Sequence, residues 1–92
     1  MAAAAAIWKF QLHPWTETVE MPAGARLLHA HEQAGQVCVW ALVNPAAPRV
    51  KRLLSVIGTG FTPSADEAYV GTAHIVEQGL VLHVFDGGEA SS

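Results

Sequence analysis

The sequence contains little that would support covalent cross-linking, insertion into a membrane or binding to a polyanion. A single cysteine excludes an internal disulfide, which is compatible with a reducing compartment. No apolar stretch approaches the roughly 20 residues that a membrane-spanning helix needs. Only five of the 92 residues are lysine or arginine and the formal charge is −3, so the basic surface of a nucleic-acid-binding protein is not expected. These absences favour a small domain held together by its apolar core.

A length of 92 residues sets the domain count at one. A chain of this size buries roughly 60–65% of the surface that its unfolded form exposes, which is enough for independent folding. Alanine inflates the hydrophobic content of 51%, in particular through the run Ala2 to Ala6. No positively charged segment precedes this apolar N-terminus, so a signal peptide is not expected. We expect residues 1–6 to form a flexible alanine-rich leader, residues 7–86 a single all-β domain, and residues 87–92 a flexible tail.

Two short apolar runs define the expected core. The first, Val37 to Val43, is rich in β-branched residues and lies between turn signals at Ala34-Gly35 and Asn44-Pro45. Its length and its flanks predict a strand that is buried on both faces. The second run, Leu80 to Phe85, has the same character and also lies between glycine-containing segments.

Turn signals recur about every ten residues along the whole chain, as they do in sandwiches and barrels. The sequence therefore predicts a compact antiparallel sandwich or a partly open barrel of about six to seven short strands. The third and fourth strands are expected to form a hairpin around residues 33–35, and the last two a hairpin around residues 77–79. The strands are expected at Ile7–Leu12, Thr16–Met21, Ala25–Glu32, Gln36–Val43, Val50–Ile57, Ala68–Ile75 and Leu80–Phe85.

Five histidines are the main candidates for chemistry. His29 and His31 are two residues apart, which places both imidazoles on one face of a strand, a spacing that metal sites in β-barrels use. His74, His83 or Glu32 could supply a third ligand. No second closely spaced pair accompanies them, so exposed or hydrogen-bonded structural histidines are the more common explanation of such a pattern. We therefore predict that no metal and no other cofactor is bound, and that His83 is half-buried with a backbone hydrogen-bond partner.

Other catalytic patterns are absent from the sequence. Cys38 lies within an apolar run, where burial raises the pKa of a thiol and makes it a poor nucleophile. Ser55 lacks the G-x-S-x-G elbow of hydrolases, and Gly58-Thr59-Gly60 lacks the lysine of a phosphate-binding loop. The acidic residues show no paired-carboxylate spacing. We expect that the protein is not an enzyme.

Aromatic residues and one basic segment indicate a binding surface. Trp15 and Phe61 fall in turns beside prolines, where an aromatic side chain is either a lid on the core or an anchor for a partner. The basic segment contains Arg49 and Lys51, which share one face of a strand, and also Arg52. The sequence therefore predicts a protein interface formed by Arg49, Lys51, Arg52, Trp15 and Phe61.

An ordered set of short segments is distributed along residues 7–86: Ile7–Phe10, Glu20–Ala25, Val39–Val43, Ile57–Gly60, Tyr69–Thr72 and Leu82–Phe85. Taken together, these segments resemble a family of small, functionally uncharacterised proteins encoded by bacteriophages and prophages. The resemblance defines no catalytic residues, and it does not require His29 or His31. It therefore implies kinship and a biological setting without implying a reaction.

Small phage accessory proteins generally act by binding, so the resemblance implies a non-enzymatic protein that binds a host protein complex. The leading hypothesis is an inhibitor of a host defence complex, such as a CRISPR–Cas effector. We expect it to act in the host bacterial cytoplasm as a monomer or homodimer, without direct contact to nucleic acid or to a membrane. Two alternatives remain open: a structural or assembly accessory of the virion, and a metal-dependent β-barrel enzyme.

Overall fold

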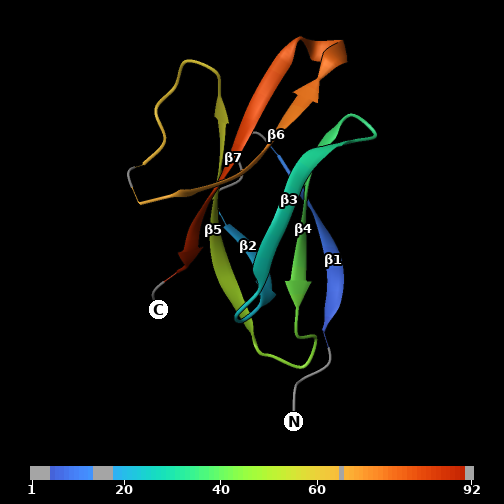
Figure 1. Cartoon of the computed structure of the whole chain (residues 1–92), viewed down its shortest axis with the longest axis vertical. Coiled ribbons are helices and arrows are strands. Elements are labelled where there is room, and N and C mark those ends of the chain that lie inside the picture. The colour runs from blue at the N-terminus through green and yellow to red at the C-terminus, as the bar shows by residue number, and fades with distance from the viewer. Residues whose placement is uncertain (1–4, 14–17, 65, 91–92) are drawn as a thin grey trace.

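The computed structural model describes residues 5–13, 18–64 and 66–90, which form an all-β fold with one short 3₁₀ helix (Figure 1). Its elements are β1 (Ala6–Leu12), β2 (Thr18–Pro22), β3 (Arg26–Gln33), β4 (Gln36–Val43), β5 (Arg49–Gly58), β6 (Ala68–Ile75), η1 (Val76–Gln78) and β7 (Leu80–Glu89). The strands form a three-stranded sheet in the order β1-β4-β3 and a four-stranded sheet in the order β2-β5-β7-β6. All paired strands in this part of the chain are antiparallel, so the predicted antiparallel sandwich is confirmed. The described residues contain no helix long and apolar enough to cross a membrane.

Both predicted hairpins are present. The β3–β4 turn uses Ala34 and Gly35, with φ of 53° and 79°, and this left-handed pair matches the twist of the flanking strands. The half-buried Glu32 carboxylate stabilises the turn by accepting a hydrogen bond of 2.6 Å from the Gly35 backbone. In the β6–β7 hairpin, η1 leads into Gly79, whose φ of 65° lets the chain reverse.

The core lies between the two sheets and consists mainly of aliphatic side chains. Its most deeply buried members include Leu12, Met21, Val39, Val43, Leu54 and Val84. The sheets come closest where the edge strands β3 and β6 contact each other. A Cβ atom added to Gly71 of β6 would lie only 2.6 Å from the carbonyl oxygen of Ala30 in β3, so glycine is needed at this crossing. This contact closes one side of the sandwich and leaves β1 and β2 as the edge strands of the other side.

β4 is the central strand of the three-stranded sheet, and its side chains alternate between the core and the outer surface. Val39 and Ala41 are fully buried, whereas Trp40 is half-buried and Leu42 is 37% exposed. The prediction of a strand buried on both faces is therefore wrong. Burial on both faces requires a layer on each side of the sheet, and among the described elements only the four-stranded sheet covers β4.

β7 extends beyond the end that the sequence predicts. It continues through Gly87 and Gly88 to Glu89, so residues 87–89, expected in a flexible tail, belong to the sheet. Gly87 is an extra residue opposite β5, and Gly88 has a φ of 84°, a combination typical of a β-bulge. The backbone N–H of Ala90 then donates a hydrogen bond of 2.8 Å to the carbonyl of Lys51. The glycine pair therefore bends the strand and does not end it.

Candidate protein-binding surface

The three basic residues of the predicted interface have different surroundings. Arg49 lies beside β1, with its Cζ atom 5.1 Å from the centroid of the Trp8 ring, and its Nη1 donates hydrogen bonds to two carbonyl oxygens of the β4–β5 loop. Lys51 is exposed on the outer face of the four-stranded sheet, opposite Glu20 of β2. Arg52 points to the other face of β5. The structure therefore does not gather the three cations into one free positive strip.

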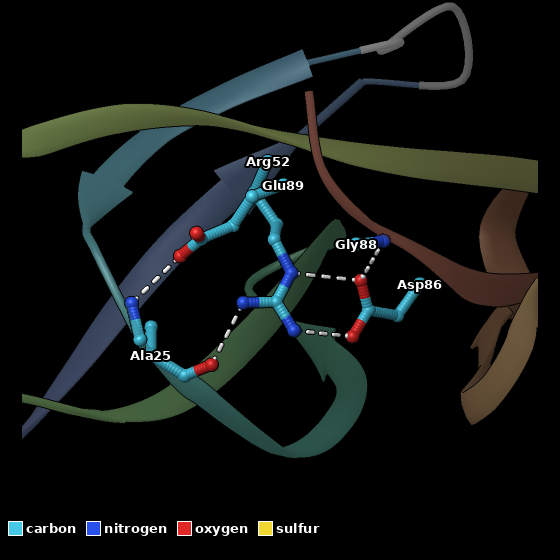
Figure 2. A network of polar contacts seen from close by, with 6 residues as sticks. Ala25, Arg52, Asp86, Gly88 and Glu89 are labelled. Carbon is cyan, nitrogen blue, oxygen red and sulfur yellow. Dashed lines mark hydrogen bonds and ion pairs between the residues drawn. The ribbon is translucent and has the colours of Figure 1, made fainter. Parts of the chain in front are cut away.

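Arg52 is the centre of the polar network in Figure 2. Its Nε and Nη2 atoms donate to the two carboxylate oxygens of Asp86 at 2.8 and 2.6 Å, and its Nη1 donates to the Ala25 carbonyl at 2.7 Å. The side chains of Arg52 and Asp86 are 13% and 16% exposed. Hydrogen bonding to the guanidinium lowers the pKa of Asp86, and hydrogen bonding to the carboxylate raises the pKa of Arg52. These hydrogen bonds connect β5 to β7 and to the β2–β3 turn, so Arg52 stabilises the fold.

The aromatic residues of the predicted interface lie far from these cations or outside the described chain. Phe61 is 77% exposed in the loop that follows β5. Arg49 and Gly58 are the two ends of β5, and at about 3.3 Å per residue the strand separates them by roughly 30 Å. Trp15 lies outside the described residues. The structure therefore does not bring Phe61 together with Arg49 and Lys51.

Four of the five histidines lie on strands and are divided between the two outer faces of the sandwich. His29 and His31 share the outer face of the three-stranded sheet, as predicted, with their rings stacked at a centroid distance of 5.7 Å. The candidate third ligands His74 and His83 lie on the four-stranded sheet, and Glu32 hydrogen-bonds the β3–β4 turn. Among the described residues, no group of three or more potential ligands could hold a metal ion.

His83 is half-buried, as predicted, but its ring nitrogens contact two side-chain hydroxyls and not the backbone partner that the sequence predicts. Nδ1 lies 3.0 Å from the Thr72 hydroxyl, and Nε2 lies 2.9 Å from the Thr59 hydroxyl. The Thr72 hydroxyl also hydrogen-bonds Tyr69 at 2.6 Å. Ser55 donates its hydroxyl hydrogen to the Glu67 carboxylate, so its hydrogen-bond partner is an acid and not an imidazole. The contacts of His83 connect β6, β7 and the loop after β5, and they pair the imidazole with two threonine hydroxyls.

The outer face of the three-stranded sheet combines apolar, basic and imidazole side chains. The strand register aligns three rows across the sheet: Ile7–Leu42–Arg26, Lys9–Trp40–His29 and Gln11–Cys38–His31. We call the surface formed by Ile7, Lys9, Gln11, Arg26, His29, His31, Trp40 and Leu42 the Trp40 face. Trp40 lies at its centre, with the His29 ring 6.1 Å away, and Ile7 is 63% exposed at one end.

The Trp40 face is positively charged although the whole chain carries a net charge of −3. It contains Lys9 and Arg26 and no carboxylate. Lys9 donates a hydrogen bond of 2.5 Å to the side chain of Gln33, and this contact spans β4 because the two residues lie on β1 and β3. Cys38, in the strand between them, is 3% exposed, and burial raises the pKa of its thiol, as predicted.

A family described as a domain of unknown function (DUF7352) matches residues 3–92. The chain belongs to this family. The expected membership of an uncharacterised family is thereby confirmed, and the match extends beyond residues 7–86 at both ends. No curated protein matches the chain, and no solved structure matches it.

Sequence reasoning missed the surface positions of Trp40 and Leu42 because it treated the whole run Val37 to Val43 as core. One signal in the sequence could have indicated this face. Of the eight acidic residues, only Glu32 lies within the three segments that form the three-stranded sheet. A sheet that is poor in acids within an acidic protein is a candidate for contact with a negatively charged partner.

Proposed function

We propose that the protein is a non-enzymatic binding module whose Trp40 face docks against an acidic surface of another protein. One observation carries this proposal: the half-buried Trp40 and the exposed Leu42 and Ile7 form an apolar centre that Lys9 and Arg26 flank, and the face carries no carboxylate. Tryptophan and arginine are enriched among the residues that dominate binding energy. Charge complementarity at the margins of such a patch accelerates and orients association.

A protein partner fits this face better than a nucleic acid does. Only Lys9 and Arg26 are permanent cations on the Trp40 face, so few phosphates could be neutralised. The rest of the chain is acidic and would repel a polyanion. An acidic protein surface with apolar residues at its centre would use the two cations and would also bury Trp40.

The bacteriophage resemblance suggests a more specific partner, a host defence complex such as a CRISPR–Cas effector. Blocking such a complex requires a complementary surface and no catalytic group. Under this proposal the protein acts in the bacterial cytoplasm by occupying a site on that complex.

Affinity capture from bacterial lysate tests the proposal with two matched variants. Arg26→Glu changes the charge of the Trp40 face, and Lys51→Glu makes the same change at an exposed strand residue of the opposite sheet. We expect Arg26→Glu to lose the captured partner and Lys51→Glu to retain it, with thermal melts confirming that both variants are folded. Loss with Lys51→Glu alone would place the interface on the strip that the sequence predicts and would overturn the proposal.

A further inference from the structure

We infer that the partner docks by adding an extended strand to the free edge of β1, where it becomes the fourth strand of the three-stranded sheet. The inference rests on the proposed function and specifies the kind of segment that binds. The segment is extended and antiparallel or parallel to β1, and it alternates apolar residues with acidic residues. Strand addition of this kind takes its affinity from main-chain hydrogen bonds and its specificity from alternate side chains.

β1 is the edge strand best suited to receive another strand. The edges β3 and β6 contact each other and each contains a register shift, at residues 27–29 and 69–71. The third edge strand, β2, has five residues and ends in Pro22. β1 has seven residues, runs in continuous register from Ala6 to Leu12, and pairs with β4 alone among the described strands. A long, regular edge without a bulge presents a row of unpaired backbone groups.

The side chains of β1 also indicate what the added strand must carry. Trp8 and Phe10 point toward the core but are only half-buried, and their ring centroids lie 6.5 Å apart. An added strand with apolar inward side chains would complete their burial. On the outer face, Lys9 is the only charged side chain of β1. The Lys9 ammonium hydrogen-bonds Gln33 across β4, and by turning to the free edge it would pair with an acidic residue placed opposite, since opposite charges stabilise a cross-strand pair.

A second copy of this chain fits the edge less well than an acidic segment does. Antiparallel pairing of two β1 strands with the longest overlap is centred on residue 9, the midpoint of Ala6–Leu12. That register places two copies of Lys9 directly opposite each other, which is destabilising. Other registers relieve the repulsion but shorten the paired region. The charge of Lys9 therefore disfavours self-association and favours a different, acidic strand.

Two synthetic peptides test the inference directly. One is acetyl-Val-Glu-Val-Glu-Val-Glu-Val-amide, and the other has lysine in place of each glutamate. We expect the acidic peptide to bind about tenfold more tightly at low salt, because it pairs with Lys9 where the basic peptide meets a like charge. In NMR titrations the β1 amides should shift, and alternate β1 amides should become protected from hydrogen exchange.

Charge reversal provides the decisive control. Lys9→Glu should reverse the preference between the two peptides, Lys9→Arg should retain it, and Lys51→Glu should leave it unchanged. Equal binding of both peptides to the parent and to Lys9→Glu, or protection confined to strands other than β1, would overturn strand addition. A concentration-dependent dimer that protects β1 in sedimentation and exchange experiments would also overturn it, in favour of a second copy.

The same measurements separate this inference from the proposed function. In one outcome, Arg26→Glu abolishes capture, and in the complex of the parent protein the β1 amides stay unprotected. The Trp40 face then binds the partner, but strand addition is wrong. If neither Arg26→Glu nor Lys9→Glu alters capture, the proposed function itself is wrong.

Discussion

Replacing Asp86 with alanine should destabilise the fold strongly, because it leaves the Arg52 guanidinium without its main partner. The substitution removes two charge-assisted hydrogen bonds from Arg52 and a third, of 2.8 Å, from the backbone N–H of Gly88. Breaking a buried ion pair from one side costs about 3–5 kcal/mol. The two side chains retain 13% and 16% exposure, so water can partly compensate. We therefore expect a loss of about 3 kcal/mol, at the lower end of that range.

Thermal unfolding measures this loss. For a chain of this length, 1 kcal/mol corresponds to roughly 4–8 °C, so Asp86→Ala should melt about 12–24 °C below the parent. Asp86→Asn keeps one acceptor oxygen and should lose only about 1–2 kcal/mol. Arg52→Met combined with Asp86→Ala removes both charges and should be no less stable than Asp86→Ala alone. A melting temperature for Asp86→Ala within about 3 °C of the parent would show that the Arg52–Asp86 pair does not stabilise the fold as expected.

The same pair predicts a pH dependence with a definite sign. Hydrogen bonding to Arg52 lowers the pKa of Asp86 from its ordinary value of 3.8. A group whose pKa is lower in the folded state stabilises the protein above its unfolded pKa and loses that contribution as the pH falls through the folded pKa. The stability difference between the parent and Asp86→Ala should therefore be full at neutral pH and should shrink below about pH 4. A difference that stays constant down to pH 2 would contradict the lowered pKa of Asp86.

Three further predictions concern the exposure of Trp40, the close approach at Gly71 and the metal content of the protein. Trp40→Ala should cost about 2 kcal/mol in thermal melts, less than the 3–5 kcal/mol of a fully buried aromatic, because Trp40 is half-buried on the outer face; a loss above about 4 kcal/mol would return Trp40 to the core. Gly71→Ala should cost at least about 2 kcal/mol because its Cβ atom would clash with the Ala30 carbonyl; an unchanged melting temperature would exclude that close approach. Elemental analysis of untagged protein should find less than one equivalent of zinc, manganese, iron or nickel, and one equivalent surviving dialysis would assign His29 and His31 to a metal site.

The order of amino acids predicts much of the local structure of this protein. The predicted bounds Gln36–Val43 and Ala68–Ile75 coincide with β4 and β6, and both predicted hairpins form. His29 and His31 share a face as expected. These features depend on the alternation of side chains along a strand and on turn residues with positive φ, and both are short-range properties of the chain.

The packing of the strands determines which surfaces stay open, and short-range sequence patterns do not predict it. An apolar run can be covered on one face or on both, and its sequence does not distinguish the two cases. Trp40 is half-buried because no described element covers the outer face of β4. Arg52 becomes structural because the register of β5 and β7 places Asp86 opposite Leu54, on the same face of the sheet as Arg52. The free edge of β1 follows from pairing between strands far apart in the sequence. Such pairing is a non-local property, and no short segment of the chain contains it.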